Sequence, residues 1–271
     1  MDTVTMDGTA AAVGTSLHFR GVSMSYPQRQ GPPTQVLADV DVRVQPGEFV
    51  CLLGPSGCGK STLLNIAAGL AEPTEGEVLV GDRPVRGPGP DRGVVFQQYA
   101  LMPWYTVRQN VELGPRCRGQ DPAERARAVD EALNAVGLRE HAQKYPKQLS
   151  GGMKQRTAIA RTFVSDPDVI LMDEPFAALD AQTRERLQQQ LLSLWGQRRK
   201  TALFVTHSVQ EATLLADRIV VLADDPDVAP QVLTNPLPRP RDPLTAEFTT
   251  AERAVHEALN RATTKSPEGE Q

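Results

Sequence analysis

A glycine-rich stretch from residue 54 to residue 62 carries the side chains best suited to phosphate chemistry. It lies between two apolar runs, which predict a strand before it and a helix after it. A glycine turn in this context lets backbone N–H groups and the positive end of the helix face phosphate oxygens. Lys60 can then reach β- and γ-phosphates, and the Ser61 hydroxyl can ligate Mg²⁺. The predicted phosphate-binding residues are Gly54, Pro55, Ser56, Gly57, Cys58, Gly59, Lys60, Ser61 and Thr62.

Ionisable side chains follow two further apolar runs. Asp173 and Glu174 end one of these runs, and His207 follows another. Open α/β sheets place ligands at the carboxyl ends of their strands. We therefore expect Asp173 to hold Mg²⁺, Glu174 to orient the attacking water, and His207 to reach the γ-phosphate or that water. The alternatives are that the two acids face solvent and that the histidine is structural.

A glutamine and a Ser-Gly-Gly sequence provide two more candidate contacts. Gln97 ends another predicted strand, and its amide group can donate to water and accept at Mg²⁺. Its position, where the chain leaves the predicted sheet, suits a sensor of bound nucleotide. Ser150, Gly151 and Gly152 begin a predicted helix, where a hydroxyl, free N–H groups and the helix dipole form a second anion site. A simple N-cap role for Ser150 is the alternative.

The composition is ordinary for a globular protein and excludes some classes. The 271 residues carry a net charge of -4, which gives no sign of a nucleic-acid-binding surface. No apolar run approaches the roughly 20 residues that span a bilayer, and the first residues lack the order of a signal peptide. Cys51, Cys58 and Cys117 lack metal-ligand spacing and suit a reducing cytosol. Cys58 is either open to oxidation or, as we expect, a small filler residue in the loop.

The apolar patterns predict the elements that position these residues. Strands that alternate with helices indicate a mainly parallel, three-layered α/β sheet, with an antiparallel β subdomain near the start. The predicted strands are 17–25, 36–44, 49–53, 77–80, 93–96, 168–172, 201–206 and 219–222. The predicted helices are 122–136 with Asp121 as its N-cap, 151–164, 181–197, 209–216 and 246–262.

The same patterns predict the domain organisation. Residues 1–16 lack periodicity and predict a disordered tail, whereas 17–225 form the predicted nucleotide-binding domain. Residues 98–154 are mostly helical in pattern and predict an inserted α-helical subdomain. Residues 226–271 predict a proline-rich C-terminal extension with a short helix and a frayed end.

In their types and their order, these motifs resemble those of the ATP-binding cassette (ABC) ATPases over residues 17–225. The resemblance implies a P-loop NTPase fold of the RecA-like type, with ATP and Mg²⁺ as cofactors. It also implies a homodimer in which the phosphate loop of one copy and Ser150–Gly152 of the other sandwich each ATP. In such a site Lys60 neutralises charge on the γ-phosphoryl group, and Gln97 contributes to catalysis and to the Mg²⁺ site.

Three further positions take their interpretation from this resemblance. Tyr26 matches the aromatic residue that stacks on adenine, and its alternative is a core tyrosine. Asp180 matches the acid that communicates across the dimer. Ala177 stands where many relatives have serine, so the resemblance does not supply that hydroxyl contact across the interface.

A narrower resemblance is to the nitrate, sulfonate and taurine branch of bacterial importers. It rests on residues 101–107, 173–176, 193–195, 206–212 and 237–241. It implies an ATPase that couples ATP hydrolysis to import of a small solute through separate transmembrane permease subunits, at the cytoplasmic face of the cell membrane. A solute-binding protein would act indirectly, and no nucleic acid is expected as a partner.

Several assignments stay open within this resemblance. Segment 101–107 is either the permease contact or ordinary subdomain core, and Phe176 and Trp195 are possible core residues. One alternative function is a soluble cassette ATPase acting on ribosomes or DNA, but such proteins usually carry two cassettes or a long coiled coil. Another is a regulatory module that binds ATP without hydrolysing it, and intact Glu174 and His207 argue against that function.

Overall fold

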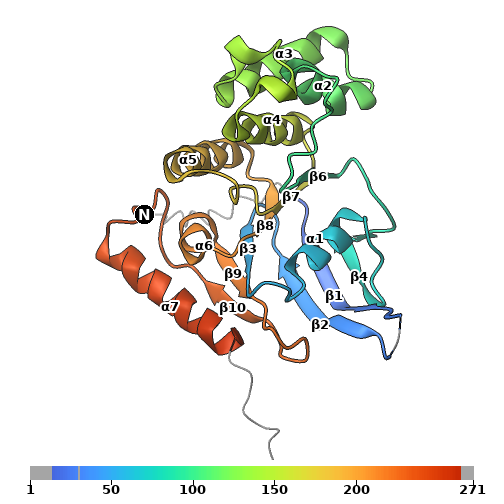
Figure 1. Cartoon of the computed structure of the whole chain (residues 1–271), viewed down its shortest axis with the longest axis vertical. Coiled ribbons are helices and arrows are strands. Elements are labelled where there is room, and N and C mark those ends of the chain that lie inside the picture. Colours follow the sequence, from blue (N-terminus) through green and yellow to red (C-terminus); the bar gives the residue numbers. More distant parts are fainter. Residues whose placement is uncertain (1–13, 30, 264–271) are drawn as a thin grey trace, which may run out of the picture.

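Two sheets and a helical subdomain make up the chain in its computed structural model, which describes residues 14–29 and 31–263 (Figure 1). Residues 1–13 of the predicted tail 1–16 lie outside the described residues. The predicted frayed end from residue 264 also lies outside them. The predicted α/β architecture with one mainly parallel and one antiparallel sheet is confirmed.

The central sheet has six strands in the order β10-β9-β3-β8-β7-β6. Five of them are parallel, and the edge strand β10 runs antiparallel to β9. Their bounds are β3 (Phe49–Leu53), β6 (Arg92–Val95), β7 (Val169–Asp173), β8 (Thr201–Val205), β9 (Arg218–Val221) and β10 (Gln231–Thr234). Parallel strands covered on both faces have continuous apolar sequences, which is why 49–53 shows no alternation.

Helices cover both faces of the central sheet and give the predicted three layers (Figure 1). Helix α1 and the antiparallel sheet pack on one face, whereas α5, α6 and α7 pack on the other. The bounds of these helices are α1 (Lys60–Ala68), α5 (Ala181–Arg198), α6 (Val209–Leu215) and α7 (Ala246–Thr263). Alternate residues of β3 belong to opposite cores, so that Val50 lies in the first core and Cys51 in the second.

The antiparallel β subdomain has four strands in the order β2-β1-β4-β5. Their bounds are β1 (Leu17–Tyr26), β2 (Thr34–Val44), β4 (Glu75–Val80) and β5 (Arg83–Pro84). Strand β1 pairs with both β2 and β4, and both pairings are antiparallel, the direction predicted for this subdomain. The two-residue strand β5 is too short for a sequence period to reveal it.

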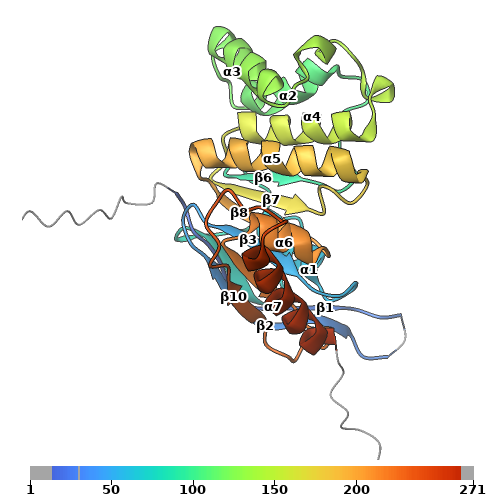
Figure 2. The ribbon, with the colours of Figure 1, turned by 90° about the vertical axis from the view of Figure 1, so that its left-hand side faces the viewer.

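The helical subdomain lies at one end of the molecule, beyond α5 (Figure 2). It contains α2 (Val107–Cys117), α3 (Pro122–Ala135), α4 (Gly151–Val164) and 3-10 turns at Arg139–His141 and Pro146–Gln148. Its separate core includes Val111, Val129 and Leu133. The predicted N-cap is confirmed, because Asp121 Oδ1 accepts hydrogen bonds from the backbone N–H groups of Ala123 and Glu124 at 2.9 and 3.2 Å.

The C-terminal part of the chain returns to the central sheet. Strand β10 lies within the proline-rich segment, where the sequence pattern predicts no strand. Helix α7 matches the predicted helix 246–262 and packs against α6 and β9. The extension is therefore a packed part of the described structure, with Phe248, Val255 and Ala258 buried.

Candidate functional site

The phosphate loop joins the carboxyl end of β3 to the start of α1, as predicted. Gly59 adopts a φ of +92°, which L side chains rarely adopt, and a Cβ there would lie 3.0 Å from the carbonyl oxygen of Val36, so glycine is favoured. The ammonium group of Lys60 donates hydrogen bonds to the carbonyl oxygens of Gly54 at 2.9 Å and Pro55 at 2.5 Å. The lysine thus lies over the loop, where it can turn to a bound phosphate.

Ser61 and Asp173 meet across the end of the central sheet. The serine hydroxyl donates a 3.1 Å hydrogen bond to Asp173 Oδ1, although 112 residues separate the two. Burial raises the pKa of Asp173, while the hydrogen bond from Ser61 acts in the opposite direction. A hydroxyl and a carboxylate oxygen side by side are the hard oxygen ligands that Mg²⁺ binds, so this donor set fits the predicted metal.

Glu174 and His207 are also brought together. Glu174 Oε2 lies 3.3 Å from Nδ1 of His207, and the glutamate N–H donates to the carbonyl of Val205 at 3.0 Å. The glutamate has a φ of +43°, a left-handed conformation that costs on the order of 1 kcal/mol for a residue other than glycine. Such strain persists where the surrounding structure holds a side chain in one direction. Here Glu174 lines the same pocket as the phosphate loop.

A pocket of about 240 Å³ joins the loop to this glutamate. Its lining residues are Ser56, Gly57, Gly59, Lys60, Ser61, Thr62 and Glu174. The pocket therefore presents phosphate-binding donors on one side and a carboxylate on the other. This arrangement can bind a triphosphate and orient a water molecule toward its terminal phosphorus.

Gln97 and Tyr26 stay apart from this pocket. The side chain of Gln97 is exposed and forms no hydrogen bond with any other residue that the structure describes. Tyr26 ends β1 and is 43% exposed, so the alternative of a core tyrosine is wrong. An exposed ring is able to stack on a base, as the resemblance implies.

The Ser-Gly-Gly sequence begins α4, as predicted, and its residues are not among those that line the phosphate pocket. Ser150 is exposed, and its Oγ accepts a 3.3 Å hydrogen bond from the N–H of Met153, which makes it an N-cap. Gly152 is buried, and a Cβ there would lie 2.6 Å from Thr183 Cγ2 on α5. The predicted second anion site therefore lies outside the phosphate pocket of its own chain.

Asp180 precedes α5 and serves as its N-cap. Its Oδ1 accepts a 2.9 Å hydrogen bond from the N–H of Thr183, which lowers the pKa of Asp180. The side chain is exposed and lies outside the phosphate pocket.

A buried polar cluster next to His207 was not predicted. Thr206 Oγ1 donates a 2.6 Å hydrogen bond to Glu211 Oε2, and Gln188 on α5 donates to Glu211 Oε1 at 3.3 Å. Burial raises the pKa of Glu211, while Thr206 and Arg184 act in the opposite direction. The signal in the sequence is an acid on the apolar face of the predicted helix 209–216.

The open assignments on segment 101–107 and the aromatic residues can be decided by burial. Trp104 is 66% exposed, so the core alternative is wrong for it, but it is right for Val107. Phe176 and Trp195 are buried core residues. Cys58 is also buried, and burial raises the pKa of its thiol, which supports the interpretation as a filler residue.

More than half of the chain matches a known family. Residues 37–177 match the family described as ABC transporter. The nitrate import ATP-binding protein of Synechococcus elongatus is 46% identical over 244 residues, which cover 89% of this chain and 89% of that protein. The taurine import ATP-binding protein of a Jannaschia species is 48% identical over 212 residues, covering 78% of this chain and 79% of that protein.

A solved structure shares the fold. The dimeric structure of a post-hydrolysis state of an ATP-binding cassette, bound to ADP and Pi, matches with a TM-score of 0.70 and 34% identity. The match covers 80% of this chain and 98% of that chain, which confirms the predicted P-loop NTPase fold. Within residues 14–29 and 31–263, no helix has both the length and the hydropathy that crossing a bilayer requires. The chain belongs to the ABC transporter family, as one of its ATP-binding, ATP-hydrolysing cassettes.

Proposed function

We propose that this chain is the ATPase subunit of an importer that moves a small solute, such as nitrate, a sulfonate or taurine, through separate permease subunits. It acts as a homodimer at the cytoplasmic face of the cell membrane, and a solute-binding protein acts indirectly. The observation that carries the proposal is the phosphate pocket with Glu174 in its wall and Ser150 outside it. Such a pocket is half of a site that a second copy completes.

The catalytic roles follow from the positions of the side chains. Lys60 and the loop N–H groups stabilise the charge that develops on the γ-phosphoryl group. Glu174 orients the attacking water. The 3.3 Å contact between Glu174 Oε2 and His207 Nδ1 keeps the histidine beside the same water. Ser61 and Asp173 would hold Mg²⁺, which would neutralise charge on the phosphates. Gln97, which lies outside the phosphate pocket here, would join them only when nucleotide is bound.

The second copy supplies the other wall of each site. Ser150, Gly151 and Gly152 at the start of α4 offer a hydroxyl and free N–H groups at the positive end of a helix of 14 residues. Two exposed residues provide further contacts. Asp180, at the start of α5, would contact the other copy, and Tyr26, at the end of β1, would stack on the adenine base. ATP binding then draws two copies together, and hydrolysis with product release lets them part.

A mixing experiment tests the composite site. Lys60→Ala disables the phosphate loop of a chain, and Ser150→Arg disables the wall that its Ser150–Gly152 segment offers to the other copy. A homodimer of either variant therefore has two defective sites. A heterodimer of the two variants has one site with both walls intact. We expect phosphate release from MgATP to return when differently tagged variants are co-purified. Inactivity of that heterodimer, with both variants folded, would contradict the shared site.

A second experiment tests the enzymatic role of Glu174. Glu174→Gln keeps the size of the side chain and removes its charge, so we expect hydrolysis to fall at least about 100-fold while ATP binding is kept. Glu257→Gln, an exposed acid on α7, is the matched control and should hydrolyse ATP normally. The rate of ATP hydrolysis also separates the two functions. Stimulation of hydrolysis by solute in the presence of the reconstituted permease supports the importer, whereas stimulation by ribosomes or DNA supports the alternative.

A further inference from the structure

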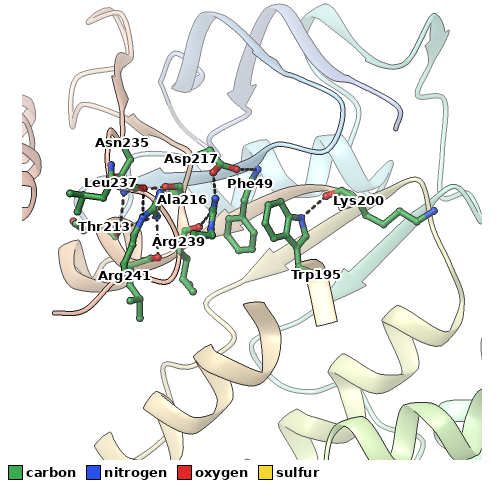
Figure 3. Close-up of polar contacts among 12 residues, drawn as sticks. Phe49, Trp195, Lys200, Thr213, Ala216, Asp217, Asn235, Leu237, Arg239 and Arg241 are labelled. Carbon is green, nitrogen blue, oxygen red and sulfur yellow. Dashed lines mark hydrogen bonds and ion pairs between the residues drawn. The ribbon is translucent and has the colours of Figure 1, made fainter. Parts of the chain in front are cut away.

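Side chains from the C-terminal extension cover the end of helix α6 (Figure 3). Arg241 Nη1 lies 3.1, 3.0 and 2.7 Å from the carbonyl oxygens of Thr213, Leu214 and Ala216. Asn235 Nδ2 donates to two of these carbonyls, at 2.7 Å to Thr213 and 3.1 Å to Ala216. Arg239 donates to the remaining carbonyl, that of Leu215. We call Asn235, Arg239 and Arg241 the C-terminal clasp.

The clasp meets a need of this particular helix. The last four carbonyl groups of an α-helix have no partner within the helix, and a helix of seven residues is not stable by itself. Here the three clasp side chains reach every one of the four. Burial lowers the pKa of Arg241 to about 10, so its guanidinium stays charged at neutral pH and interacts favourably with the negative end of α6.

Arg239 also contacts two other elements of the core. Its guanidinium lies 4.8 Å from the ring centre of Trp195, near the end of α5, and it forms an ion pair with Asp217. Asp217 Oδ2 in turn accepts a 3.0 Å hydrogen bond from the N–H of Phe49, the first residue of β3 (Figure 3). The clasp thus reaches one end each of α5, α6 and β3.

The opposite ends of α6 and β3 lead to the phosphate site, and the opposite end of α5 leads to the proposed dimer contact Asp180. Helix α6 follows His207, β3 leads into the phosphate loop, and α5 begins at its N-cap Asp180. At the His207 end, the N–H of Ser208 donates to Thr206 Oγ1 at 3.0 Å, and the N–H of Glu211 donates to Ser208 Oγ at 3.2 Å. Hydrogen bonds therefore run without a break from the clasp, through α6, to the residues on either side of His207.

We infer that Asn235, Arg239 and Arg241 are positioning residues for ATP hydrolysis, which act through α6 to hold His207 beside Glu174. The inference rests on the proposed role of His207. The clasp lies outside residues 37–177, the part of the chain that matches the family, so the family match does not supply this role. A shift of this short helix displaces the residue that precedes it, His207, and catalysis is sensitive to displacements of about 1 Å.

Two substitutions of Arg241 test the inference in the purified full-length chain. Arg241→Met keeps the buried stem but removes the donors, and we expect kcat for MgATP to fall about tenfold with KM within about twofold. Arg241→Lys keeps a charge and donors and should recover most of the rate. Val255→Ala is the matched control, because it weakens packing of the buried face of α7 without touching the carbonyls of α6. It should lower Tm but leave kcat within about twofold.

The His207→Ala background separates positioning from general destabilisation. If the clasp acts through His207, Arg241→Met should cause no further loss of the residual rate in that background. An equal loss with and without His207, or a loss in Arg241→Met no larger than in Val255→Ala, overturns the inference. A wild-type rate in His207→Ala alone instead overturns the proposed role of His207, so the two failures are distinguishable.

Discussion

The hydroxyl of Thr206, the residue directly before His207, donates a 2.6 Å hydrogen bond to the buried carboxylate of Glu211. Gln188 on α5 donates to the same carboxylate at 3.3 Å, and Arg184 approaches it to 3.8 Å. Glu211 therefore joins the end of β8, the middle of α5 and the first turn of α6. Removing the carboxylate should disturb all three at once.

This buried carboxylate makes stability depend on pH. Burial raises the pKa of Glu211 above the ordinary value of 4.5, so the folded chain binds its proton more readily than the unfolded chain. The favourable contribution of the protonated form is complete below pH 4.5 and is lost as pH rises through the folded pKa. Glu211→Gln removes this dependence. The Tm of the variant minus that of the wild type should therefore rise from pH 4.5 toward neutral pH in calorimetry, and a constant difference would contradict the explanation.

Gly152 lies so close to α5 that a side chain at this position should clash with Thr183, and a smaller residue at 183 should relieve the clash. Gly152→Ala places a Cβ 2.6 Å from Thr183 Cγ2, which should cost about 1–3 kcal/mol of stability. Thr183→Ser removes that methyl group and keeps the backbone N–H that binds Asp180. We expect the double variant to be more stable than Gly152→Ala alone in urea unfolding, with Thr183→Ser as the control. A fully stable Gly152→Ala chain would show that α4 and α5 are free to separate.

Thiol reactivity should distinguish the three cysteines. Cys117 is exposed, whereas Cys51 and Cys58 are buried and burial raises the pKa of both thiols. A thiol reagent such as DTNB should therefore modify Cys117 first in the native chain, and all three only after denaturation. Cys117→Ser should abolish the fast reaction. Fast modification of Cys58 would instead support the idea that the phosphate loop is open to oxidation.

The exposed indole of Trp104 predicts a separation of transport from basal hydrolysis. Because the side chain is 66% exposed, Trp104→Ala should change stability by no more than about 0.5 kcal/mol and leave basal hydrolysis intact. Solute uptake in vesicles with the permease should fall. Val107→Ala, at a buried position nearby, should lower Tm instead. Normal uptake by the Trp104→Ala complex would exclude the permease contact.

The motifs and the elements around them could be predicted from local sequence because each belongs to one strand end or one helix start. The phosphate loop, Asp173 and the helix beginning at Gly151 are of this kind. The Glu211 cluster and the clasp were not predicted, since their partners are distant in sequence and depend on how α5, α6 and the extension pack. Strand β10 was missed because four residues at a sheet edge carry too short a pattern. The exposure of Tyr26 also follows only from the assembled sheet.

The order in which the chain is synthesised gives the clasp one more consequence. Helix α6 leaves the ribosome before Asn235, Arg239 and Arg241, so until they emerge its last four carbonyls bind only water. The phosphate loop, near the other end of the chain, is made long before the segment that fixes His207. Strand β3, which leads into that loop, pairs with β8 and β9, so the loop is anchored only once residue 221 has emerged. If the clasp holds His207, the site is aligned later still, after residue 241.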